Sequence, residues 1–199
     1  MVAVSLLDRV RGALLAVPNG ADRVIENEGL DQSAATPAAV LFPIVLREPA
    51  PTVLLTLRTS HLRDHPGQVS FPGGRVEAAD ASPLETALRE TEEEIGLSRR
   101  HIEVVGYLPD YLTGTGFRVT PVVAWVRPPF ELVPDQFEVA EVFEVPLAFV
   151  LDEANHQRMA IHAGGRRRDF FTMPYRERFI WGATAGMIRC LHDRLGPAA

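Results

Sequence analysis

The 199-residue sequence has little of what marks secreted or membrane proteins. It contains one cysteine, Cys190, which excludes an intrachain disulfide and is typical of a reducing compartment. No stretch approaches the ~18 consecutive apolar residues that a membrane-spanning helix requires. Residues 1–18 include Asp8, Arg9 and Arg11, a charge pattern unlike that of a signal peptide. The sequence therefore predicts a cytoplasmic protein with no membrane partner.

Positive charge is also in short supply. Lysine and arginine total 20 against 26 aspartate and glutamate residues, which gives a net charge of −6. Nucleic-acid-binding proteins generally carry a basic surface, so this balance argues against a nucleic-acid partner. The sequence also lacks a convincing Ser-His-Asp or Cys-His arrangement, and Cys190 fits a buried apolar position better than a nucleophilic one. A covalent mechanism through a nucleophilic side chain is therefore not expected.

What the chain does contain is a mixture of strand and helix patterns in a length that suits one domain. Residues 4–16 have the apolar spacing of an amphipathic helix, and residues 19–36 suit a linker or an ordered wrap. Strands are expected at 38–46, 52–57, 69–71, 102–107, 119–126, 137–145, 160–162 and 170–173. Shorter helical patterns follow at 146–151 and near the end of 175–195. Pro43 favours a sheet edge or a bulge for the first strand. This mixture predicts an α/β or α+β fold.

The strongest local signal is a helix that begins after Ser82. Residues 82–85 read as a capping box, with Pro83 at the first helical position, where a missing N–H costs nothing. Gly96 provides the stop. An apolar stripe along this helix is expected to face the core, and its members are Leu84, Ala87, Leu88, Thr91 and Ile95.

Three acidic residues, Glu90, Glu93 and Glu94, project beside this stripe. Like charges three or four residues apart on a helix repel by about 0.2–0.5 kcal/mol per pair. A divalent cation would turn that repulsion into coordination, because hard cations bind carboxylate oxygens. The simpler interpretation of such a run is a solvated acidic face.

The context of the acidic run favours the cation. Upstream lies the glycine turn Phe71-Pro72-Gly73-Gly74, and residues 89–97 read RETEEEIGL. Together they resemble the Nudix box, G-x5-E-x7-R-E-U-x-E-E-x-G-U, where U is aliphatic. Two departures are present: the interval from Gly74 to Arg89 is one residue longer than the pattern, and Thr91 occupies an aliphatic position. The first acidic position is therefore open between Glu77 and Asp80.

The preceding residues add a second resemblance. The coenzyme A diphosphatase branch of the Nudix superfamily has the approximate signature LLTxR[SA]xxxRxxxGxxxFPGG. Residues 54–74 match it at its Leu-Leu-Thr start, both arginines, the glycine and the FPGG turn, with Thr59 in place of serine or alanine. The two motifs cover about 44 residues in register. The resemblance implies the Nudix fold, a mixed β-sheet between α-helices, in a domain of residues 38–195. Residues 1–37 would form an N-terminal helix and linker packed on it.

The resemblance also implies a metal site for Mg²⁺ or Mn²⁺. Glu90 and Glu94 are the expected first ligands, and Glu93 belongs to the same cluster as a further ligand or proton acceptor. The backbone carbonyl of Gly73 is an additional candidate ligand.

Catalytic roles are expected for Glu93, Arg89 and a loop carboxylate. Arg89 precedes Glu93 by one helical turn and suits an orienting role, although an ordinary surface ion pair explains it equally well. Nudix proteins often take a last ligand or base from a loop after the box. Glu138 is the first choice for that role and Glu141 the second.

Binding of coenzyme A, with its diphosphate and 3′-phosphate, would need several cations. Arg58 and Arg63 match the added signature, and the planar guanidinium suits phosphate oxygens. Gln68 could donate hydrogen bonds, and Gly67 could let the backbone approach the ligand. His65 is the remaining candidate, though a hydrogen-bonded structural histidine is an equally good interpretation.

The resemblance thus favours hydrolysis of coenzyme A to 4′-phosphopantetheine and adenosine 3′,5′-bisphosphate. One alternative is a Nudix hydrolase of another nucleoside diphosphate derivative, such as ADP-ribose, a dinucleoside polyphosphate or an NADH-like compound. Another is a non-catalytic nucleotide-binding module, which would have no need for repelling carboxylates. The expected partner is a small nucleotide substrate, and a homodimer is one option for the assembly.

Overall fold

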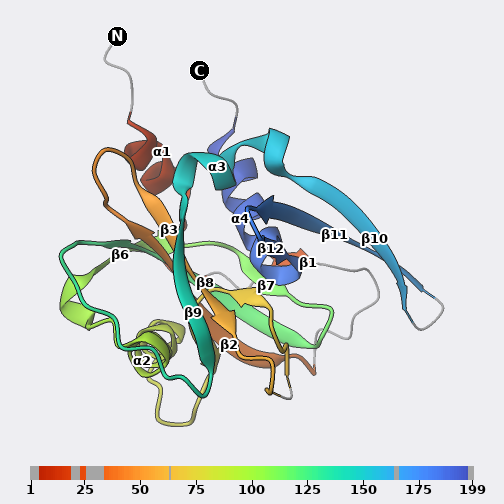
Figure 1. The fold of residues 1–199 in the computed structure, drawn as a ribbon, viewed down its shortest axis with the longest axis horizontal. Coiled ribbons are helices and arrows are strands. Elements are labelled where there is room, and N and C mark those ends of the chain that lie inside the picture. The colour runs from red at the N-terminus through yellow and green to blue at the C-terminus, as the bar shows by residue number, and fades with distance from the viewer. Residues whose placement is uncertain (1–4, 19–22, 26–33, 63, 164–165, 197–199) are drawn as a thin grey trace.

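The computed structural model describes residues 5–18, 23–25, 34–62, 64–163 and 166–196. Within these ranges the chain forms a nine-stranded mixed sheet, a three-stranded antiparallel sheet and helices against their faces (Figure 1). The helices are α1 (Leu6–Ala13), α2 (Pro83–Ile95), α3 (Leu147–Leu151) and α4 (Gly182–Leu195), with 3₁₀ turns η1 (Arg99–His101) and η2 (Glu153–Asn155).

The large sheet is built around two long parallel strands, β2 (Thr36–Val45) and β8 (Phe117–Val126). Antiparallel neighbours flank this pair, and one further parallel pair joins β1 to β7. The remaining strands are β1 (Arg23–Ile25), β3 (Thr52–Arg58), β4 (Val69–Ser70), β5 (Gly73–Arg75), β6 (Ile102–Tyr107), β7 (Asp110–Leu112) and β9 (Val139–Pro146). The expected mixture of strand directions and helices is confirmed.

Alternation along β2 explains why both faces of the sheet are covered. Phe42 and Ile44 point into a core cluster that also contains buried residues of α1, α3 and α4. Ala39 and Leu41 point to the other face, where they meet buried residues of α2. Successive side chains of a strand alternate between faces, so one apolar strand can hold a helix layer on each side. The helix α2 is thereby fixed against the sheet.

The expectation for Pro43 is wrong. β2 lies inside the sheet and keeps a regular register with β8, in which Pro43 pairs with Ala124. Its other side is shared between two short partners, β5 at residues 38–40 and β3 at residues 44–45. Pro43 falls between these two pairings, where its missing N–H breaks no antiparallel ladder bond.

The helix α2 confirms its predicted ends. The Ser82 hydroxyl accepts a hydrogen bond from the Glu85 N–H at 3.3 Å, and Pro83 opens the helix. Gly96 stops it in the left-handed conformation with φ 68°, which costs glycine nothing. The Thr91 hydroxyl donates to the Ala87 carbonyl at 2.6 Å, so a polar residue is satisfied on the buried stripe.

The second sheet joins β10 (Gln157–Ala163), β11 (Arg166–Tyr175) and β12 (Arg178–Trp181), and β12 leads directly into α4. The hairpin of β10 and β11 extends away from the body of the molecule (Figure 1). At the other end of the chain, α1 packs on α4 and Leu15 bridges to Tyr107. Of the expected linker, only 23–25 and 34–36 lie among the described residues.

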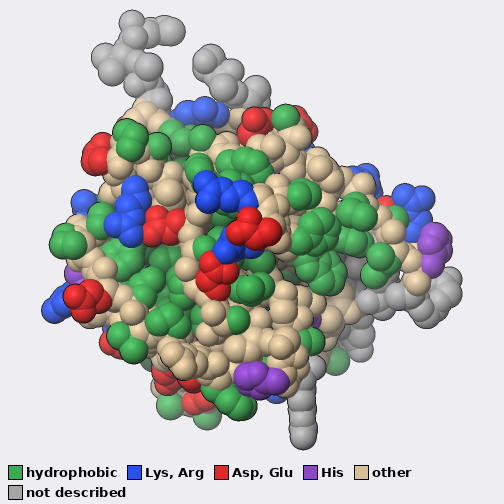
Figure 2. Space-filling view, in the orientation of Figure 1, with side chains coloured by type: hydrophobic (Ala, Val, Ile, Leu, Met, Phe, Trp, Pro, Cys, Tyr) green, Lys and Arg blue, Asp and Glu red, His purple; other side chains and the backbone are tan. Residues whose placement is uncertain are grey.

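The outer surface carries mixed charge. Figure 2 shows acidic and basic side chains interspersed on the viewed face, with apolar patches between them. Among the described helices, none is long and apolar enough to cross a membrane.

Candidate active site

A cavity of about 670 Å³ opens where the glycine turn, the acidic helix and the start of α4 meet. Its volume lies in the range of small-molecule sites. Its lining includes most of the site residues proposed from the sequence, and these are Arg58, His65, Gln68, Gly73, Glu90, Glu94 and Glu138. Three other candidates, Gly67, Arg89 and Glu93, are not in its lining. Arg63 lies outside the described residues.

The glycine turn packs directly against the acidic helix. Phe71 anchors the turn in the core, with its ring 4.3 Å from that of Phe42. The Gly73 N–H then donates to Glu94 Oε2 at 3.2 Å. A Cβ at Gly74 would lie 2.4 Å from a carboxylate oxygen of Glu90, so a larger residue there would displace that carboxylate. The first motif thus holds the backbone against the carboxylates of the second.

Glu94 is the most deeply placed carboxylate of the helix, with a side chain only 5% exposed. Arg58 Nη1 lies 3.5 Å from its Oε1 and is its ion-pair partner. The pKa of Glu94 is nevertheless raised to about 8, chiefly by burial and in smaller part by the nearby Glu90 and Glu138 carboxylates, which together outweigh the lowering by Arg58 and the Gly73 N–H. Burial also raises the pKa of Glu90. These desolvated carboxylates are the groups that a cation would stabilise most.

We expect the free energy of unfolding of the metal-free protein to fall as pH rises from about 5 to 8. Over that interval folded Glu94, with its pKa near 8, binds a proton that the unfolded chain, with a pKa near 4.5, has released. The contribution of Glu94 to the free energy of unfolding is therefore complete below its unfolded pKa. It is lost as pH rises toward the folded pKa, by on the order of 3 kcal/mol. Urea unfolding in EDTA across this pH range measures it. Glu94→Gln should remove the slope that Glu94 causes, so an equal slope in both proteins would contradict the assignment.

Arg89 forms the centre of an ion-pair network beside the cavity. Its Nε and Nη2 bind both carboxylate oxygens of Asp80 at 3.0 and 2.9 Å, and Nη1 binds Glu90 and Glu93 at 3.0 Å each. The Arg89 guanidinium holds the pKa of Asp80 well below its usual range. Glu77 is 63% exposed, 4.0 Å from Arg89, and lines the cavity instead. Of the two acids left open by the motif, Asp80 is therefore the close partner of the arginine.

The three glutamates of the motif do not share one environment. Glu93 is 60% exposed and turns toward Arg89, whereas Glu90 and Glu94 line the cavity. In the described part of the chain, no group of three or more acidic, histidine or cysteine side chains is placed to hold a metal ion. Arg89 pairs with Glu90 and Glu93, and Arg58 pairs with Glu94. The donor set nevertheless fits a hard cation, because Glu90, Glu94 and Glu138 offer oxygen ligands to one cavity.

The basic loop before the glycine turn contributes a fixed polar wall. His65 has φ 56°, and its Nδ1 lies 3.0 Å from the Gln68 side-chain oxygen. This is the hydrogen-bonded arrangement considered as one interpretation of His65. Gly67 has φ 66° and open space around it, so glycine is needed there for the turn. The Arg58 Nε is buried and has no hydrogen-bond partner among the described residues, which leaves a donor near Glu94.

The loop carboxylate chosen from sequence lies in the cavity. Glu138 precedes β9 and lines the site, and its carbonyl accepts from the Thr59 N–H at 2.9 Å. The second choice, Glu141, is bound by Arg178 and is not in the lining. The motifs missed the far wall of the cavity, which includes Phe117, Trp181 and Met187. For Trp181 and Met187 the sequence signal was an apolar run leading into the last helix, and Phe117 had no such signal.

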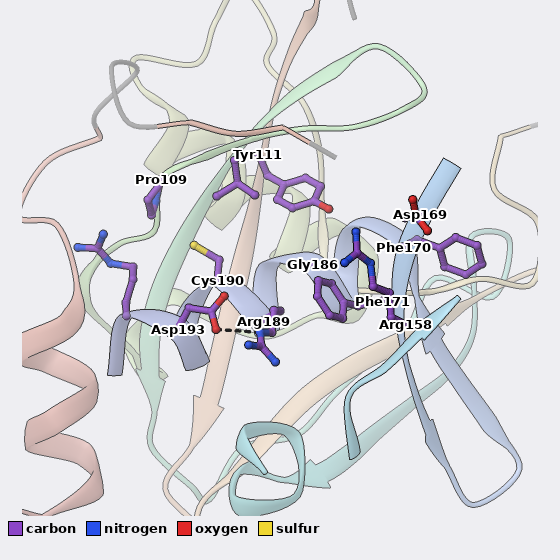
Figure 3. Close-up of a pocket in the computed structure, with 12 residues that line it drawn as sticks. Pro109, Tyr111, Arg158, Asp169, Phe170, Phe171, Gly186, Arg189, Cys190 and Asp193 are labelled. Atoms are coloured by element: carbon purple, nitrogen blue, oxygen red, sulfur yellow. Dashed lines mark ion pairs between the residues drawn. The ribbon is translucent and has the colours of Figure 1, made fainter. Parts of the chain in front are cut away.

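A second cavity, of about 450 Å³, is lined by residues of α4, β7 and β11 (Figure 3). Each of its carboxylates already has an arginine partner. Asp193 lies 2.8 Å from Arg189 Nε, the ion pair drawn in Figure 3, and Asp169 accepts from Arg167 at 2.9 Å. Burial raises the pKa of the Cys190 thiol here to about 11, which keeps it protonated. The chemistry therefore points to the first cavity as the active site.

Comparison with known proteins identifies the family of the chain. The sequence model of the NUDIX domain matches residues 36–163, well over half of the chain. The chain belongs to the Nudix hydrolase family. It is 45% identical over 159 residues to the protein named uncharacterized Nudix hydrolase NudL of Escherichia coli (strain K12), covering 80% of this chain and 82% of the relative. The relative of the same name from Enterobacter sp. (strain 638) is 44% identical with the same coverage.

The fold comparison places this Nudix hydrolase among solved structures. The NUDIX domain of Shewanella oneidensis NrtR, crystallised with ADP ribose, superposes with a TM-score of 0.52 at 19% identity, over 84% of this chain and 94% of that one. This likeness confirms the fold. Nudix hydrolases act on the pyrophosphate bonds of nucleoside diphosphate derivatives and generally use divalent metal ions, so this Nudix hydrolase is an enzyme of that class.

Proposed function

We propose that the substrate is coenzyme A or one of its derivatives, cleaved at the diphosphate to 4′-phosphopantetheine and adenosine 3′,5′-bisphosphate. The observation that carries the proposal is the meeting of both motifs in one cavity. Arg58, Gly73 and Gly74 come from the signature that resembles coenzyme A diphosphatases, and Glu90 and Glu94 come from the Nudix box. The proposed catalytic domain spans residues 38–195.

The proposed metal ligands are Glu90, Glu94, Glu93 and the Gly73 carbonyl, for Mg²⁺ or Mn²⁺. When bound, the cation neutralises phosphoryl oxygens and lowers the pKa of its water. Glu94 suits this role because its burial leaves a carboxylate short of positive charge. Glu93 could act as a further ligand or as the base, though its present contact with Arg89 requires it to turn.

The remaining roles belong to the chain itself. Glu138 lies next to the end of β3, where its carbonyl accepts from the Thr59 N–H and Val139 pairs with Arg58, and it is the alternative proton acceptor for the attacking water. Arg58 and Arg63, the two arginines of the added signature, would bind the diphosphate, since guanidinium groups match phosphate oxygens bidentately. Arg89 orients Glu90 and Glu93 through direct hydrogen bonds. Diphosphate hydrolysis depends mainly on positioning and charge, which these groups supply.

The direct test is incubation of the purified protein with coenzyme A and either Mg²⁺ or Mn²⁺. We expect the two products to appear with cation and not in EDTA, and coenzyme A to be cleaved with a higher kcat/KM than ADP-ribose or a dinucleoside polyphosphate. Brisk cleavage of ADP-ribose without cleavage of coenzyme A would leave only the family activity.

A variant of Arg63 separates the two substrate classes. Arg63→Ala should reduce kcat/KM for coenzyme A more than for ADP-ribose, since the arginine belongs to the added signature. Arg100→Ala is the control, because Arg100 is exposed on η1 and is not in the cavity lining. Equal losses on both substrates would favour a different nucleoside diphosphate derivative.

A further inference from the structure

The lining of the candidate active-site cavity includes apolar residues to which no catalytic role is assigned. They are Phe117, Val119, Trp181, Ala183 and Met187. These residues come from β8, the end of β12 and α4, at least 20 positions away from either motif. Hydrolysis of a diphosphate needs charge, so an apolar wall in the same cavity indicates a place for a part of the substrate that does not react.

We propose that Trp181 determines specificity by stacking on the adenine ring of the nucleotide substrate. This inference rests on the proposed function, in which the substrate carries an adenosine moiety beside its diphosphate. A planar base offers a π-face to an indole, whereas the pantetheine arm of coenzyme A is a flexible amide chain without one. Stacking of a base on an aromatic side chain contributes affinity for any nucleotide, because every base has a π-face.

The position of Trp181 suits this role. Ile180, its neighbour on β12, is fully buried in the core, so alternation turns Trp181 to the opposite face of the strand. Phe170 packs against the indole with ring centroids 5.6 Å apart and an angle of 62° between the planes. This contact restricts the ring, while the side chain stays partly exposed beside the cavity. A preorganised aromatic group loses little freedom when a base binds.

Phe117 is the other aromatic residue of the lining, and its surroundings are different. The guanidinium of Arg75 lies over its ring, 5.3 Å from the centroid. One face of Phe117 is therefore already covered by a cation. Trp181 has the larger ring and no cation over it among the described residues. Of the two, Trp181 is the better stacking surface.

Fluorescence tests the inference without any turnover. The chain has two tryptophans, and Trp125 is only 3% exposed within the sheet, so a ligand-dependent change reports Trp181. We expect AMP to quench the emission of the metal-free protein in a saturable way and ribose 5-phosphate to leave it unchanged. The quench should persist in Trp125→Phe. No quench by AMP, or an equal quench by ribose 5-phosphate, would overturn the inference.

Kinetics supply the second test. Trp181→Ala should raise KM for the adenosine-bearing substrate about tenfold with kcat changed less than twofold, and Trp181→Phe should recover most of the loss. Phe179→Ala is the matched control, because Phe179 lies on the same strand, is exposed and is absent from the lining. Thermal melting shows whether each variant is folded.

The outcomes separate the two proposals. If coenzyme A is not cleaved but AMP quenches selectively, the proposed substrate fails and the role of Trp181 stands. If coenzyme A is cleaved and Trp181→Ala lowers kcat while leaving KM unchanged, the substrate stands and the stacking role is wrong.

Discussion

Replacing Glu94 with glutamine is expected to lower kcat of diphosphate hydrolysis by about a thousandfold, a loss typical of removing a buried electrostatic group from an active site. Glutamine keeps the shape of the side chain and can still accept the Gly73 N–H bond, so the fold should persist. What disappears is the charge, and with it an anionic oxygen for the cation. Steady-state kinetics at saturating Mg²⁺ or Mn²⁺ measure the loss.

The matched control is Glu92→Gln on the same helix. Glu92 has a half-exposed side chain 3.7 Å from Arg99 and does not line the cavity. The Glu92→Gln variant should retain near-normal kcat. This result would show that the loss in Glu94→Gln depends on where the charge is removed and not on the total charge of the helix. Titration with Mn²⁺ should show weaker binding only for Glu94→Gln. Full activity in that variant would remove Glu94 from the proposed metal ligands.

Replacing Gly73 with alanine is expected to destabilise the protein by about 3 kcal/mol or more, within the range for severe backbone strain. A Cβ there would lie 2.4 Å from the Ala39 carbonyl oxygen and 2.6 Å from the Val40 Cα, both backbone atoms that cannot move aside. The residue also has φ 153°, a conformation that residues with a side chain avoid. The pairing of β5 with β2 would have to open.

Urea denaturation of the variant and of Gly12→Ala tests this expectation. Gly12 lies in α1 with nothing within 4 Å of its would-be Cβ, so alanine there should be neutral or stabilising by up to about 1 kcal/mol. If Gly73→Ala unfolds within 1 kcal/mol of the natural protein, the turn is more adaptable than the structure indicates, and its role in placing Glu94 weakens.

The parts of the fold that sequence predicted best are those with local causes. The helix α2 was predicted to the residue, because Ser82, Pro83 and Gly96 act on the backbone within one turn of themselves. The glycine turn and the acidic residues were found for a similar reason, since short motifs keep chemical groups at fixed intervals. Most of the candidate site could therefore be proposed from residues 54–97.

The features that were missed depend on contacts between distant segments. The short strand β7 exists because β8 and β1 flank it. Pro43 is tolerated because it lies between the segments of β2 that pair with β5 and with β3. The apolar wall of the cavity comes from β8, the end of β12 and α4, and α4 reaches β4 through the Thr184 hydroxyl bond to the Val69 carbonyl. The burial of Glu94, against the exposure of Glu93 one residue earlier, likewise follows from how the helix sits on the sheet.

Every N–H donor of Arg89 is already used within its network. A guanidinium carries five N–H groups, and here Asp80 accepts two, Glu90 and Glu93 one each, and the Arg75 carbonyl the fifth. No N–H remains for a phosphate unless an existing partner lets go. A lysine has three N–H groups on one atom and could not make the same five hydrogen bonds. It would keep the positive charge but leave at least two of these acceptors without a donor.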